Sequence, residues 1–210
     1  MEITPENLLE KAALTFWRAR QPLAAAVLFA DLVGGGSEAP PVWCGLGSSL
    51  MASRGVLVRQ PFEAWAARVF ARAMPLVAGT PFEAAAKTWA AELPVASAVA
   101  FTAAEAPALL DFLLVTDAVL PDAVAPLPEE DRMFAVMAMG DRANVRYVPV
   151  LCAAIDGRFG PGAARSALKR VGPFLDRVDL RAALGRAARA PASQELQPYL
   201  GWVLARIGQG

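Results

Sequence analysis

The chain has 210 residues, which is enough for one or two domains with a sizeable core. It is 56% hydrophobic, and its 20 basic residues are balanced by 20 acidic ones. This balance disfavours nucleic-acid binding over the whole surface, because proteins that bind in this way are usually clearly basic. The absence of histidine excludes histidine as a general base, a catalytic-triad member or a metal ligand.

The N-terminal part of the chain is predicted to be helical, with prolines at the helix starts. Thr4 and Pro5 fit the cap and the first position of a helix. Pro22 and Pro40 are expected to begin two further helices, separated by the glycine-rich loop at 34–37. A helix start at proline costs little, since the missing amide would have no partner there.

The helices between about residues 6 and 78 resemble tetratricopeptide repeats. The first repeat would place small residues and aromatic residues at Ala12, Ala13, Phe16, Ala26 and Phe29. The second would match the Trp-x-x-Leu-Gly-x-x-Tyr run of the family at Trp43, Leu46, Gly47 and Leu50, with Leu50 in place of tyrosine. The resemblance implies helical hairpins in which small residues, such as Gly47, let two helices approach closely.

Two capping boxes are predicted further along, at Thr80-x-x-Glu83 and at Thr102-x-x-Glu105. The second leads into an apolar run at 109–119, which favours one long central helix. The Pro/Ala-rich stretch 121–128 is interpreted as a linker between a first domain, 1–120, and a second domain, 129–210.

Charge changes sign along the chain near this linker. All eight charged residues between Thr88 and Asp131 are acidic. From Arg132 onward, 12 basic residues stand against five acidic ones. The neutral total therefore hides an acidic middle and a basic C-terminal part.

The stretch 140–172 is predicted to form a hairpin of two helices. Gly140 is expected to end the preceding helix, Asp141 to cap the next one, and Pro149 to kink it. Glycines at 157–162 would form the turn, and Gly172 would end the second helix. Neither apolar stripe can be buried by one hairpin alone, so neighbouring hairpins are needed.

The pattern Gly-Asp-x-x-x-Val, Val-Pro-x-Leu and Ala-x-x-Ala-Leu-x-x-Val-Gly in this hairpin resembles a HEAT-type repeat, of the short kind also found in phycobilin lyases. A weaker copy follows at 180–208. The resemblance implies stacked antiparallel helices and a binding surface. With the N-terminal resemblance, it leads us to expect an all-α fold, specifically a right-handed α-solenoid of antiparallel helix pairs.

No catalytic set is visible. Cys44 and Cys152 lie in apolar helical patterns and do not have metal-ligand spacing. Ser166 and Lys169 match a Ser-x-x-Lys motif whose companion elements do not occur in the chain. The acidic run 129–131 suits the first turn of a helix as well as a cation. We therefore expect neither enzymatic activity nor a cofactor or metal site.

One cluster of basic residues is a candidate binding site. Residues four apart fall on one face of each helix of the 140–172 hairpin and would align into a ridge: Arg142, Arg146, Arg165, Lys169 and Arg170. Such a ridge could bind phosphate groups or an acidic protein segment, and a solvated face is the plainer alternative.

The predicted function is that of a protein-interaction adaptor or assembly subunit whose partner is another protein. Phosphate or nucleic-acid binding through the basic C-terminal helices is the alternative. Trp43 is a candidate anchor residue, because tryptophan is favoured at binding hot spots. The start of the sequence is polar and no stretch reaches the about 18 apolar residues of a membrane span, so a cytoplasmic protein is expected.

Overall fold

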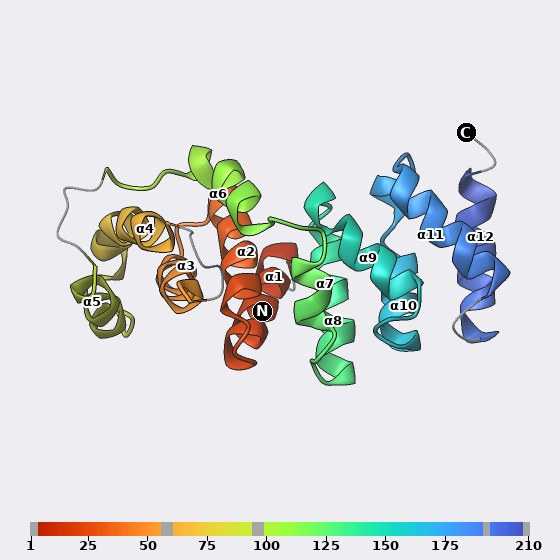
Figure 1. Cartoon of the computed structure of the whole chain (residues 1–210), viewed down its shortest axis with the longest axis horizontal. Coiled ribbons are helices and arrows are strands. Elements are labelled where there is room, and N and C mark those ends of the chain that lie inside the picture. Colours follow the sequence, from red (N-terminus) through yellow and green to blue (C-terminus); the bar gives the residue numbers. More distant parts are fainter. Residues whose placement is uncertain (1–3, 56–60, 94–98, 191–193, 208–210) are drawn as a thin grey trace. The chain divides into compact units, whose positions relative to one another are not determined.

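A computed structural model describes residues 4–55, 61–93, 99–190 and 194–207 (Figure 1). All regular secondary structure in these ranges is helical, which confirms the predicted all-α class. The chain divides into two compact units. Residues 10–115 form the N-terminal unit, and residues 116–210 together with 1–9 form the C-terminal unit. The division lies at 115/116, whereas the sequence suggested a boundary at 121–128.

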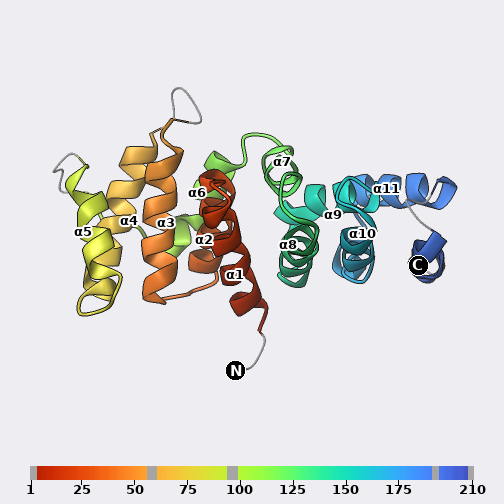
Figure 2. The same ribbon diagram turned by 90° about the horizontal axis from the view of Figure 1, so that it is seen from below.

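The N-terminal unit begins within α1 Pro5–Arg18, at residue 10. Its other helices are α2 Pro22–Gly34, α3 Pro40–Ser53, α4 Phe62–Val77, α5 Glu83–Ala91, the short 3₁₀ helix η1 Ala103–Glu105, and α6 Ala106–Leu113. The predicted starts at Pro5, Pro22 and Pro40 are correct. Helix α3 packs against α2, α4 and α5, and α6 packs on α2 (Figure 2).

Two glycines bring α3 close to its neighbours. A Cβ atom on Gly45 would lie 2.5 Å from the Phe29 ring of α2, and one on Gly47 would lie 2.6 Å from the Phe70 ring of α4. Real Cβ atoms essentially never come within 3.0 Å of another non-bonded heavy atom. The expectation that Gly47 permits close helix packing is therefore confirmed. Helix α3 packs directly against the rings of Phe29 and Phe70.

The predicted helix ends of this unit are partly right. The box at Thr102 forms, and the Thr102 amide donates to the Glu105 carboxylate at 3.0 Å. The box at Thr80 does not form, because the Glu83 carboxylate accepts from the Gly79 amide instead, at 2.8 Å. The long helix expected over 109–119 is also wrong: α6 ends at Leu113, and Leu114 leaves the helical conformation with ψ 59°.

The C-terminal unit contains the remaining helices: α7 Val119–Val124, α8 Glu129–Asp141, η2 Val145–Tyr147, α9 Val148–Ile155, α10 Pro161–Leu168, η3 Gly172–Phe174, α11 Val178–Arg189, η4 Gln194–Leu196 and α12 Gln197–Ile207. Alternate helices lie side by side. Helix α8 packs on α10 and α10 on α12, while α7 packs on α9 and α9 on α11. The stretch 121–128, expected as a linker, is helical through Val124.

The start of the 140–172 hairpin differs from the prediction. Gly140 and Asp141 belong to α8, and the cap is Asn144, whose side chain accepts from the Arg146 amide at 3.1 Å. Pro149 does not kink a helix, because it occupies the first turn of α9, where its missing amide needs no partner. The turn at 157–162 forms as expected, with Gly160 at φ +89° immediately before α10. Among the described helices, none has the length and hydropathy required to cross a bilayer.

Candidate functional site

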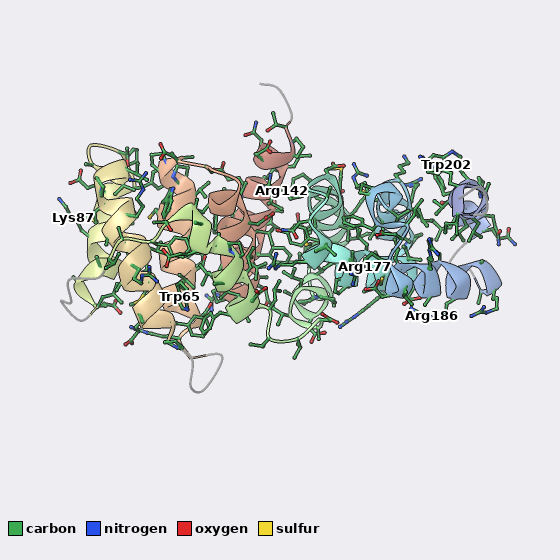
Figure 3. The ribbon with its side chains drawn as sticks, turned by 90° about the horizontal axis from the view of Figure 1, so that it is seen from above. Trp65, Lys87, Arg142, Arg177, Arg186 and Trp202 are labelled. Atoms are coloured by element: carbon green, nitrogen blue, oxygen red, sulfur yellow. The ribbon has the colours of Figure 1, made fainter. Side chains whose placement is uncertain are left out.

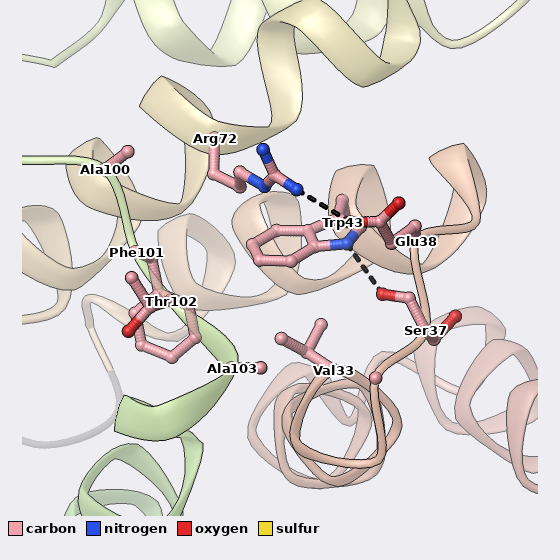
Figure 4. A pocket seen from close by; sticks show the side chains of 10 residues that line it. Val33, Ser37, Glu38, Trp43, Arg72, Ala100, Phe101, Thr102 and Ala103 are labelled. Carbon is pink, nitrogen blue, oxygen red and sulfur yellow. Dashed lines mark hydrogen bonds and ion pairs between the residues drawn. The ribbon is translucent and has the colours of Figure 1, made fainter.

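An open pocket of about 300 Å³ lies in the N-terminal unit (Figure 4). Its lining comes from α2, α3 and the loop that joins them, from helix α4, and from the segment 100–103, which leads into η1. Trp43 and Phe101 give it apolar walls, and Arg72 with Glu38 gives it a charged edge. The pocket therefore combines aromatic surface with one ion pair.

The loop between α2 and α3 owes its shape to a glycine. The Ser37 amide donates to the Leu32 carbonyl at 3.1 Å, and the Gly36 amide donates to the Val33 carbonyl at 2.9 Å. This pair of bonds is a Schellman motif, which needs a left-handed residue at Gly36, and φ there is +89°. The motif turns the chain so that the Ser37 carbonyl faces the indole of Trp43 (Figure 4).

Trp43 is a wall of the pocket and not a protruding anchor. Its side chain is almost wholly buried, with 3% of its surface exposed. Its Nε1 donates to the Ser37 carbonyl at 2.9 Å, and its ring meets Phe101 edge to face at 6.1 Å between centroids. Trp43, a candidate anchor residue from the sequence, therefore lies buried in the wall of the pocket, and its role in binding stays a prediction.

The charged edge of the pocket comes from residues 34 positions apart. A terminal nitrogen of Arg72 lies 2.8 Å from a Glu38 carboxylate oxygen, and the Arg72 guanidinium lies 5.9 Å from the centre of the Trp43 ring. The Arg72 side chain is 40% exposed and that of Glu38 is 69% exposed. Because exposed ion pairs contribute little to stability, a carboxylate from outside could replace Glu38 at small cost.

This arrangement can bind but offers little chemistry. The described residues that line the pocket include no cysteine, lysine or tyrosine. An apolar side chain could lie against Trp43 and Phe101 while a neighbouring carboxylate meets the Arg72 guanidinium, which binds carboxylates in a fixed fork geometry.

The predicted basic cluster lies in the C-terminal unit, where two of its members hold carboxylates. Arg142 pairs with Glu6 at 3.2 Å. Arg170 binds Asp141 through two nitrogens, at 2.6 and 3.1 Å, and its stem covers Gly140. These charges are used within the fold, so they add little to an external phosphate site.

The other three members are placed differently. Arg165 is exposed on α10 and Lys169 is exposed immediately after its end, and the Lys169 ammonium lies 5.4 Å from the Tyr199 ring centre. Arg146 is half-buried in η2. The continuous ridge expected from the sequence is therefore reduced to one exposed pair, Arg165 and Lys169.

A second cleft, of about 450 Å³, lies in the C-terminal unit and includes Cys152. Burial raises the pKa of this thiol to about 11, with a further contribution from the carboxylates of Asp179 and Asp156 that Arg186 partly offsets. Arg186 is held on Asp156 by two hydrogen bonds, at 3.0 and 2.7 Å. The thiolate is the nucleophilic form of cysteine, so this environment suppresses reactivity near neutral pH.

Alkylation of Cys152 is therefore expected to be slow and to depend steeply on pH. In a Cys44→Ser background, the rate with iodoacetamide should rise about tenfold per pH unit from pH 8 to pH 10, because the thiolate fraction rises in that proportion below the pKa. An unperturbed thiol would level off near pH 9. Mass spectrometry of timed samples gives the rate, and a plateau below pH 9.5 would contradict the raised pKa.

Sequence reasoning identified Trp43 but missed Arg72, Glu38 and Phe101. The one local signal was the capping box at Thr102, which fixes the end of the extended segment that carries Phe101. Phe101 is further fixed by its amide, which donates to the Arg68 carbonyl at 2.9 Å. These contacts join segments about 30 residues apart, and no periodic pattern records them.

No protein-family model matches the chain, and no curated protein or solved structure is significantly similar to it. The resemblances to tetratricopeptide and HEAT repeats therefore stay predictions from the sequence.

Proposed function

We propose that the protein is a non-catalytic protein-interaction adaptor that binds a short segment of a partner protein. The observation that carries this proposal is the pocket with an aromatic wall and an exchangeable ion pair, Arg72 with Glu38. A segment with an acidic residue beside a large apolar residue fits both features, because each would replace water at a preformed surface.

The fold supports this proposal through its architecture. In the C-terminal unit each helix packs on the one two positions further along, from α8 to α10 to α12 and from α7 to α9 to α11. Stacks of this kind are built from hairpins that contact only their neighbours, and they present extended surfaces. We propose that the helices form a right-handed α-solenoid of antiparallel pairs, as the sequence resemblances imply.

Two substitutions at the pocket edge are expected to act in opposite directions. Peptides selected from a random display library against the full chain should be enriched in Asp or Glu next to a large apolar residue. Arg72→Glu should weaken their binding at least about tenfold, the equivalent of about 1.4 kcal/mol. Glu38→Gln should tighten binding, because it removes the internal competitor for Arg72.

Arg54→Glu is the matched control for this experiment, since Arg54 is an exposed arginine of the same unit that pairs with Glu92 at 2.8 Å. Its peptide affinity, measured by fluorescence anisotropy, should equal that of the parent protein. A library that yields no acidic-apolar consensus, or an equal loss in Arg54→Glu and Arg72→Glu, would count against the proposed site.

Phosphate or nucleic-acid binding is the second candidate function. It is favoured by two exposed basic residues, Arg165 on α10 and Lys169 immediately after it. The expected result is a salt-dependent mobility shift of labelled RNA or DNA that Arg165→Glu with Lys169→Glu abolishes. Absence of a shift at low salt would exclude it, and the peptide experiment is unaffected by that outcome.

A further inference from the structure

The outward face of α12 is apolar although no described helix covers it. Trp202 has 53% of its surface exposed, and Pro198, Gly201 and Ala205 are exposed beside it. The opposite face of α12 carries Leu200 and Val203, which are buried against the unit. Figure 3 labels Trp202 beside the last helix of the chain.

On this face the large side chain of Trp202 stands beside Gly201, which has no side chain. Nothing lies within 4 Å of a Cβ built on Gly201, so the backbone there is open. Ala205, one turn further, is also small. The Arg206 guanidinium covers one side of the Trp202 ring, 4.9 Å from the ring centre. The other side of the ring stands next to the open, small-residue surface of Gly201 and Ala205.

We propose that α12 pairs in antiparallel orientation with α12 of a second copy of this chain. A two-fold axis can place Trp202 opposite Gly201 of the other copy, and the same register places Pro198 opposite Ala205. Each helix then supplies one tryptophan and one recess, which is the self-complementarity that a two-fold interface requires. Burial of two large aromatic rings gives the pair its driving force.

Charge complementarity selects the antiparallel orientation and a second copy as the occupant. Glu195 is exposed at the N-terminal end of this face and has no ion-pair partner among the described residues, while Arg206 lies at the other end. In the register above, Arg206 faces Gln197. Glu195 precedes Gln197 by two residues in the 3₁₀ helix η4, about 4 Å along the axis, within reach of an arginine side chain. Parallel pairing would bring like charges together.

Sedimentation equilibrium of the full chain tests the proposal. The parent protein is expected to show a concentration-dependent dimer. Trp202→Ser should raise the dissociation constant at least about 30-fold, the effect of removing a hot-spot tryptophan. Glu195→Arg and Arg206→Glu should each weaken the dimer, by about tenfold, because two attractive contacts become repulsive. Arg189→Glu, an exposed charge on α11, is the control and should dimerise like the parent.

Mixing the two charge variants gives the decisive measurement. Glu195→Arg with Arg206→Glu restores opposite charges at both contacts, so the equimolar mixture should dimerise about as tightly as the parent. A parent that is monomeric at all concentrations would overturn the proposal, as would dimers insensitive to Trp202→Ser or a mixture no tighter than its components. Circular dichroism of each variant verifies that the helices are intact. The peptide experiment at the Trp43 pocket does not depend on this result.

Discussion

Phe101→Ala is expected to lower the free energy of unfolding of the N-terminal unit by about 3–5 kcal/mol, the usual cost of truncating a buried phenylalanine. Phe101 is 1% exposed although it lies in an extended segment. Its ring meets Trp43 at 6.1 Å and Trp65 at 5.9 Å, in both cases edge to face. Trp65 continues the cluster to Phe112 at 6.0 Å.

The loss should be large because Phe101 joins α3, α4 and the segment before α6. Its removal leaves a cavity lined by two tryptophan rings that are held elsewhere, Trp43 by its bond to Ser37. Rings fixed in this way cannot collapse into the space, and the cost of truncation grows with the cavity that remains.

Urea unfolding followed by circular dichroism measures this change. Val99→Ala is the matched control, because Val99 lies two residues away in the same segment and is 76% exposed. Its effect should stay within about 0.5 kcal/mol, as for ordinary surface positions. Phe101→Leu should fall between the two. Equal destabilisation by Phe101→Ala and Val99→Ala would refute the role assigned to the aromatic cluster.

Several features of the fold are local, and the sequence was enough to predict them. The helix starts at Pro5, Pro22 and Pro40 and the capping box at Thr102 depend on residues within one turn. The close-packing role of Gly47 was expected from the resemblance to tetratricopeptide repeats, in which small residues let two helices approach closely. The chemistry of such positions is complete within a few residues of sequence.

The helix boundary near residue 140 depends on contacts between residues far apart in the chain, and the local sequence pattern predicts it wrongly. Gly140 looks like a helix end, yet it lies inside α8, where the stem of Arg170 fills the space that a Cβ would occupy. Asp141 looks like a cap, yet it holds the Arg170 guanidinium, and Asn144 takes the capping role. Both errors have one cause, a contact across 29 residues that outweighs the local preference.

The residues of the candidate pocket also could not be grouped from local sequence patterns. Trp43 was found by its residue type, but burial decided its role, and burial depends on Phe101 and the loop before α3. Arg72 and Glu38 have no distinguishing neighbours in the sequence, since Arg72 is one exposed charge in a helical pattern and Glu38 is one exposed charge in a loop. Only the turn at Gly36 and the docking of the segment 100–103 bring them to one pocket.

Gly47→Leu is expected to destabilise the N-terminal unit by about 3 kcal/mol or more, and Gly47→Ala by about 1–3 kcal/mol, because both overpack a filled interface. A Cβ at this position would lie 2.6, 2.8 and 2.9 Å from three atoms of the Phe70 ring. Phe70 is 2% exposed, so its ring has no open space to enter. The clash exceeds the gain in helix propensity, which is about 1 kcal/mol for glycine to alanine.

A double-mutant cycle distinguishes this clash from other effects of the substitution. Phe70→Leu removes the ring atoms that the new Cβ would meet, so Gly47→Ala should cost less in that background than in the parent, and the two substitutions should not be additive. Gly55→Ala in the same unit is the control, because nothing lies within 4 Å of its Cβ position. Thermal and urea unfolding give the free energies. If Gly47→Ala were as well tolerated as Gly55→Ala, α3 and α4 would have to be further apart than the contact with Phe70 requires.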